Sequence, residues 1–134
     1  MSDIDPNQNN PLRSLFGPLP VGRINRALAL ELEPGDVVFS RRARQHAAEH
    51  HPDDFPLCLP FVASVVANPL YVGDDFRNDS KIELICRIPA LGSGLLVAIS
   101  VRRDPSGLCR IASIYPISDR KIANRLDKGL LIRA

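Results

Sequence analysis

The chain of 134 residues is 45% hydrophobic and 24% charged, which is typical of one soluble globular domain with a modest core. Its longest apolar runs, "LLVAI" and "FVASVVA", are too short to span a bilayer, and the polar N-terminus "MSDIDPNQNNPLRS" lacks the pattern of a secretory signal. We therefore expect a cytoplasmic protein that does not contact a membrane.

The charge is unevenly distributed along the chain, although the formal net charge is only +2. Residues 1–101 carry 9 basic and 12 acidic side chains, a net of −3, whereas residues 102–134 carry 8 basic and 3 acidic side chains, a net of +5. This asymmetry permits a polyanion partner for the C-terminal third.

The first half of the chain predicts an arm followed by helices. Residues 1–20 are rich in Asn, Asp and Pro without a hydrophobic period, so we expect a flexible N-terminal arm and a domain over residues 21–134. "VGRINRALALELEPGD" predicts a helix that the "PGD" ends, and "VVF" predicts a short strand. Ser40 is then the N-cap of a helix of about ten residues, which Pro52 ends. A further helix is expected around residues 57–67, and "NPLYVGDDFRNDS" is expected to be a loop.

The second half of the chain predicts three strands and a helix. "KIELICRI" alternates apolar and polar residues, "GLLVAISVRR" is nearly continuously apolar, and "LCRIASIYP" follows after the hairpin turn "DPSG". In the last of these strands, Ser113 and Tyr115 are two residues apart and are expected on one face. Ser118 then caps a C-terminal helix that stops at Gly129. The predicted fold class is therefore α+β, with N-terminal helices packed on a small antiparallel sheet and a C-terminal helix.

The cysteines do not indicate a redox or metal motif. Cys58, Cys86 and Cys109 occur singly in apolar stretches, and no two of them form a C-x-x-C pair. Such cysteines are typical of buried, reduced thiols, so neither a disulfide framework nor a thiolate zinc site is expected.

All three histidines lie within "RRARQHAAEHHP", and this clustering has three interpretations. His46 and His50 are four residues apart and project from one helix face, as two imidazoles on one zinc ion do, and His51, Asp53 or Asp54 would have to complete the set. The second interpretation is a polar helix end that is merely solvated. We expect neither a bound metal ion nor another cofactor.

The third interpretation is cleavage of a phosphodiester without a metal ion. RNA carries its own nucleophile, the 2′-OH, so the enzyme must supply a general base, a general acid and groups that stabilise charge on the phosphate. Histidine suits both proton-transfer roles, and the guanidinium of arginine suits the phosphate. The chain offers these residue types on one helix, around one hairpin and at one strand end: His46, His50, His51, Arg102, Arg103, Arg110, Ser113 and Tyr115.

Several motifs follow one another over roughly residues 21–132. They are "VVFSRRARQHAAEHHP", then "VVANPLYVGDD", "KIELICRI" and the long stretch that contains "IASIYPIS". Together they resemble the phage-associated nuclease-like domains of the barnase–EndoU–colicin–RelE superfamily. The specific parts of the resemblance are the H-x(4)-H-P element, the N-P-x-Y-V loop and the I-x-S-x-Y-P-I-S strand end.

The resemblance implies a barnase/RelE-like fold and a metal-independent ribonuclease or toxin. Its two histidines correspond to His46, the expected general base, and His51, the expected general acid, although the two roles can be exchanged. Its strand hydroxyl corresponds to Ser113, with Tyr115 beside it, and both would orient the scissile phosphate. The expected substrate-binding residues are His50, Arg102, Arg103 and Lys121, and Lys81 is a further cationic candidate.

The resemblance also implies partners for the domain. These are RNA, such as tRNA or mRNA, and an immunity protein or antitoxin. The alternative is a non-catalytic module of the same fold that binds a protein or a nucleic acid through the same face, because a fold does not guarantee an activity.

Overall fold

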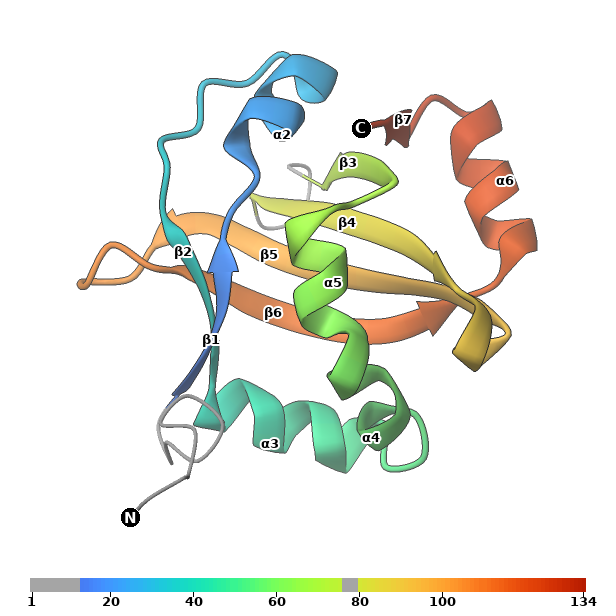
Figure 1. The fold of residues 1–134 in the computed structure, drawn as a ribbon, viewed down its shortest axis with the longest axis horizontal. Helices are drawn as coiled ribbons and strands as arrows, with labels where there is room; N and C mark the ends of the chain where they lie inside the picture. Colours follow the sequence, from blue (N-terminus) through green and yellow to red (C-terminus); the bar gives the residue numbers. More distant parts are fainter. Residues whose placement is uncertain (1–12, 76–79) are drawn as a thin grey trace.

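A twisted β-sheet runs through the whole protein, with helices on both of its faces (Figure 1). The computed structural model describes residues 13–75 and 80–134. Within these residues the sheet has seven strands in the order β1-β2-β6-β5-β4-β3-β7. The strands are β1 (Arg13–Pro18), β2 (Asp36–Ser40), β3 (Tyr71–Asp75), β4 (Lys81–Ile88), β5 (Ser93–Arg103), β6 (Cys109–Ile117) and β7 (Ile132–Arg133). The helices are α2 (Val21–Leu28), α3 (Arg41–His50), α4 (Phe55–Cys58), α5 (Val62–Ala67) and α6 (Asp119–Asp127), with short 3-10 turns η1 (Leu59–Phe61) and η2 (Pro89–Leu91).

The α+β class and the three central strands are confirmed. β4, β5 and β6 form the expected antiparallel meander, but the sheet is larger than predicted and is not purely antiparallel. β2 pairs with β6 in parallel, through Val37 opposite Cys109. This pairing places the start of α3 beside β6, so α3, the helix that carries His46 and His50, lies below β6 in Figure 1.

Two segments expected to be irregular are strands. β1 lies inside the expected arm of residues 1–20 and pairs antiparallel with β2, so the folded part begins before residue 21. Residues 1–12 of that arm lie outside the described residues. β3 lies inside the segment expected to be a loop and pairs with β4 over its whole length. Both strands contain Gly and Pro or lie beside them, which weakened the local strand signal, and pairing with a neighbour decides their conformation.

Capping serines, a residue in the left-handed conformation and a proline determine where the helices begin and end. Ser40 caps α3 by accepting a hydrogen bond from the backbone N–H of Ala43 at 3.2 Å, as expected. Ser118 caps α6 in the same way, through the backbone N–H of Lys121 at 3.2 Å. The helix expected over residues 21–36 ends at Leu28, because Ala29 adopts a left-handed conformation with φ 55°. The helix expected around residues 57–67 is broken into α4, η1 and α5, since Pro60 cannot donate a backbone hydrogen bond.

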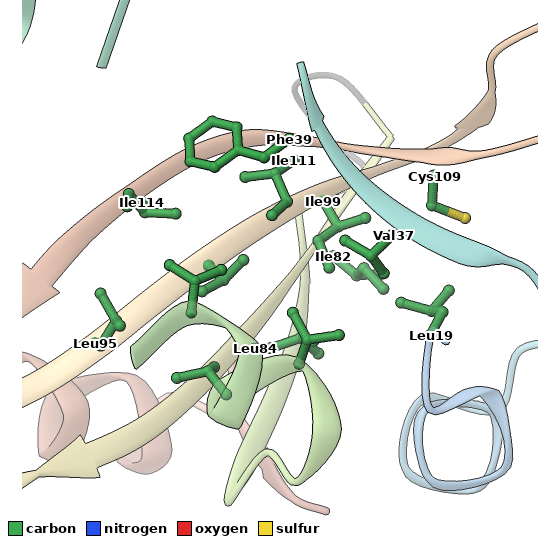
Figure 2. Packing of buried hydrophobic residues seen from close by; sticks show 14 of the residues in the cluster. Leu19, Val37, Phe39, Ile82, Leu84, Leu95, Ile99, Cys109, Ile111 and Ile114 are labelled. Atoms are coloured by element: carbon green, nitrogen blue, oxygen red, sulfur yellow. The ribbon is translucent and has the colours of Figure 1, made fainter. Parts of the chain in front are cut away.

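The hydrophobic residues form two clusters, one on each face of the sheet. The larger cluster lies under α2, α4 and α5, and Figure 2 shows Phe39, Ile82, Leu84, Leu95 and Ile99 converging within it. The smaller cluster lies under α6, where Ile122 packs with Ile117. Arg125 also binds Glu83 of β4 at 2.6 Å and helps to hold α6 on the sheet. No helix within the described ranges is long and apolar enough to cross a membrane.

One extra residue in β6 changes which side chains share a face. Ile99 of β5 lies opposite Ile111, but Ala98 lies opposite Ser113, so Ala112 is the extra residue of a β-bulge. Ile111 and Ile114 therefore both belong to the larger cluster. Because directly opposed residues share a face, Ser113 lies with Ala98 on the side of the smaller cluster.

Candidate functional site

The histidine helix α3 presents two imidazoles side by side. Its buried residue is Ala47, so the helix rests on the sheet through small side chains and turns its polar residues outward. His46 and His50 are both exposed, and their ring centroids are 4.1 Å apart with the ring planes inclined by 43°. The i, i+4 spacing on a regular helix accounts for this contact.

His51 leaves the helix and approaches the sheet. It is the C-cap residue of α3, with φ −134° and ψ 60°, so the helix ends before Pro52 as predicted. Its ring stacks on Tyr115 of β6, with centroids 6.5 Å apart and planes inclined by 26°. The resemblance pairs His46 with His51, and such a pair would need the turn at Pro52 to bring His51 toward His46. The turn instead directs His51 to the strand, while the ring contact of His46 is with His50.

Ser113 and Tyr115 lie on one face of β6, as expected. No register shift separates these two residues. Arg110 lies opposite Val38, which points away from the larger cluster. Because of the bulge at Ala112, Arg110 is on the same face as Ser113 and Tyr115. The same pairing rule places further polar residues on this face of β4 and β5. Beside the apolar part that α6 covers, the face therefore has a polar part formed by Lys81, Glu83, Ser100, Arg110 and Ser113.

The distances along β6 separate the predicted residues into two groups. Ser113 is two residues from Tyr115, which corresponds to about 7 Å along a strand. The hairpin end of β6, where Cys109 lies opposite Arg103, is six residues from Tyr115, which corresponds to about 20 Å along the strand. Lys121 lies beyond the other end of β6, in the first turn of α6, with an exposed side chain. Arg102 and Lys121 therefore lie on the two flanks of the Tyr115 region rather than at its centre.

Arg103 has a structural role. Its guanidinium donates hydrogen bonds to the main-chain carbonyl oxygens of Pro34 at 2.9 Å, Gly107 at 3.2 Å and Glu33. Gly35 lacks a Cβ and so leaves room for this guanidinium. Arg103 thus joins the hairpin to the segment before β2, and these bonds compete with the phosphate-binding role expected from the sequence.

We predict that Arg103→Ala lowers the free energy of unfolding by about 1–3 kcal/mol, because three carbonyl oxygens lose a charged donor. The neighbouring exposed Arg102 is the matched control, and Arg102→Ala should change stability by less than about 0.5 kcal/mol. Urea denaturation of both variants measures the difference. Equal stability of the two variants would show that the carbonyl contacts of Arg103 are not stabilising.

The cysteines are poor candidates for a nucleophile. Burial raises the pKa of the Cys58, Cys86 and Cys109 thiols above the usual value, and the nearby Asp54 carboxylate raises the pKa of Cys58 further. A thiol with a raised pKa forms little of the reactive thiolate at neutral pH. This fits the expectation of inert, reduced cysteines.

A small pocket that the sequence did not indicate lies at the other end of β4. Its volume is about 180 Å³, and it lies between η2, the start of β5 and the N-terminus of α6. Arg87 crosses it to bind Asp119 at 3.2 Å and the Tyr71 hydroxyl at 2.9 Å. These bonds attach the start of α6 to β3 and β4. Arg87 and Asp119 in the pocket wall therefore have a structural role.

Comparison of the chain with protein-family models, with curated proteins and with solved structures finds no match.

Proposed function

We propose that this protein is a metal-independent ribonuclease of the barnase–EndoU–colicin–RelE type. The observation that supports this proposal best is the contact between His51 and Tyr115, which joins the histidine helix to the strand that carries Ser113. This contact joins one imidazole, that of His51, to the face of β6 on which Ser113 and Tyr115 lie.

The proposed reaction uses the 2′-OH of RNA as the nucleophile. An imidazole removes the 2′-OH proton as the oxygen attacks the phosphorus, and the P–O5′ bond breaks as a second imidazole protonates the leaving oxygen. The products are a 2′,3′-cyclic phosphate and a 5′-hydroxyl. We assign the base to His46 and the acid to His51, and the contact of the His51 ring with Tyr115 supports a role for His51 beside the strand.

Hydroxyls and arginines have separate tasks in this proposal. Ser113 and Tyr115 donate hydrogen bonds to the scissile phosphate, where charge grows in the transition state. Arg102 and Arg110 are both exposed, Arg110 lies on the same face as Ser113, and both residues lie several positions farther along the sheet. They therefore suit neighbouring phosphates of the bound strand and contribute affinity rather than rate.

The substrate chemistry tests the proposal directly. We expect the purified protein to cleave single-stranded RNA and tRNA equally well with and without EDTA, and to leave a 2′,3′-cyclic phosphate on the fragment. An oligonucleotide with one 2′-deoxy residue 5′ of the scissile bond is the matched control, and it should not be cut there. Cleavage of that oligonucleotide, or cleavage that EDTA abolishes, would contradict the mechanism.

The alternative function is binding without catalysis through the same face. The partner would be a nucleic acid or a protein, such as the immunity protein or antitoxin that the resemblance implies. If no RNA is cut at high protein concentration while a stable complex with a macromolecule forms, this alternative replaces the ribonuclease.

A further inference from the structure

The pair of exposed imidazoles on α3 has a second chemical capacity. His46 and His50 follow each other by one helical turn, and their ring centroids are 4.1 Å apart. Rotation of the two side chains can bring one nitrogen of each ring to a single ion, because both side chains are exposed and their backbone is held in a regular helix. The same spacing of two histidines on a helix is used to bind zinc in metalloproteases.

The ligand type determines which ions suit the pair. Imidazole nitrogen suits Zn²⁺, Ni²⁺ and Cu²⁺, whereas Mg²⁺ and Ca²⁺ prefer oxygen ligands. Within residues 13–75 and 80–134, no group of three or more His, Cys, Asp or Glu side chains is placed to hold an ion. The pair therefore corresponds to an open site with two protein ligands, in which water fills the other positions, and not to a closed structural site.

Coordination and proton transfer use the same atoms. A metal ion binds the lone pair of a neutral imidazole nitrogen, and a nitrogen engaged in this way cannot accept a proton from the 2′-OH. His51 lies outside the pair, because its ring is stacked on Tyr115. An ion on His46 and His50 would therefore disable the assigned general base without filling the rest of the site.

We propose that His46 and His50 chelate a divalent transition-metal ion, represented by Zn²⁺, and that the bound ion inhibits the protein. The inhibitory half of this proposal rests on the proposed ribonuclease function, whereas the chelation does not. Zinc would act here as an inhibitor and not as a cofactor.

Calorimetric titration of the tag-free protein with ZnCl₂ tests the chelation. We expect one zinc site, a loss of affinity on the order of tenfold or more in both His46→Ala and His50→Ala, and no loss in His51→Ala. MgCl₂ should give no binding heat. The absence of zinc binding, unchanged affinity in His46→Ala and His50→Ala, or an equal loss in His51→Ala would overturn the two-histidine site.

Rates of RNA cleavage test the inhibition separately. Zinc at a saturating concentration should abolish cleavage by the wild-type protein, and EDTA should restore it, whereas the same concentration of MgCl₂ should not inhibit. If zinc binds to the pair but the rate is unchanged, the inhibitory half is wrong. If no RNA is cut under any condition, the proposed function fails, and the titration still decides the metal site.

Discussion

His51→Ala is expected to lower the rate of RNA cleavage by about 10²–10⁴-fold, the usual contribution of one general acid or base. The fold should be little affected, because His51 is exposed at the end of α3 and substitutions at such sites change stability by less than about 0.5 kcal/mol. Initial rates on a defined oligoribonucleotide, together with urea denaturation, measure both effects. Wild-type activity in His51→Ala would remove His51 from the catalytic residues.

Two further substitutions sharpen this result. Tyr115→Phe keeps the ring that stacks on His51 but removes the hydroxyl, so its rate loss reports the contribution of the hydroxyl. Gln45→Ala, an exposed change on the same helix as His46, is the matched control and should leave the rate unchanged. Equal losses in Gln45→Ala and His51→Ala would indicate damage to α3 instead of lost chemistry.

Phe39→Ala is expected to give the largest loss of stability, about 3–5 kcal/mol. The Phe39 side chain is fully buried, and its ring lies 6.2 Å from that of Phe16 and 6.1 Å from that of Phe55. It therefore joins β1, β2 and α4 at the point where the chain enters α3. Since a domain of this size is stable by about 5–15 kcal/mol, the loss is a large share of the total.

The shift of the urea midpoint measures this loss. Phe39→Leu keeps most of the volume and should cost less than about 1.5 kcal/mol, so it also remains folded for the measurement. Phe61→Ala is the matched control, because Phe61 is only half-buried and should cost less than Phe39. A Phe39→Ala variant no less stable than Phe61→Ala would contradict the central position of Phe39.

The parts of the fold that local chemistry determines were predictable from the sequence. Serine caps, prolines and apolar alternation identified α3, α6 and the strands β4, β5 and β6. β1 and β3 were missed because their partners β2 and β4 decide their conformation, while Gly17 and Gly73 weaken the local signal. The bulge at Ala112 has no local signature either, since it becomes visible only in the pairing of β5 with β6.

In the candidate site too, features set by the local sequence were predictable, whereas contacts between distant segments were not. Pro52 predicted correctly that the helix ends before this proline. The i, i+4 spacing indicated that His46 and His50 share a helix face, but the resemblance favoured His46 and His51 as the pair. The partner of His51 was not predictable, because Tyr115 comes from a strand far away in the chain. Arg103 likewise resembled its neighbour Arg102 in sequence, and only its contacts with three carbonyl oxygens distinguish it.

The parallel pairing of β2 with β6 has a consequence for synthesis on the ribosome. The histidines are translated early, but the strand that pairs with β2 and carries Tyr115 is translated near the end of the described chain. Parallel pairing between distant segments closes a long loop and is slow. The nascent chain therefore exposes its histidines before the strand that carries Tyr115 is made, and the contact between His51 and Tyr115 can form only after β6 has left the ribosomal tunnel.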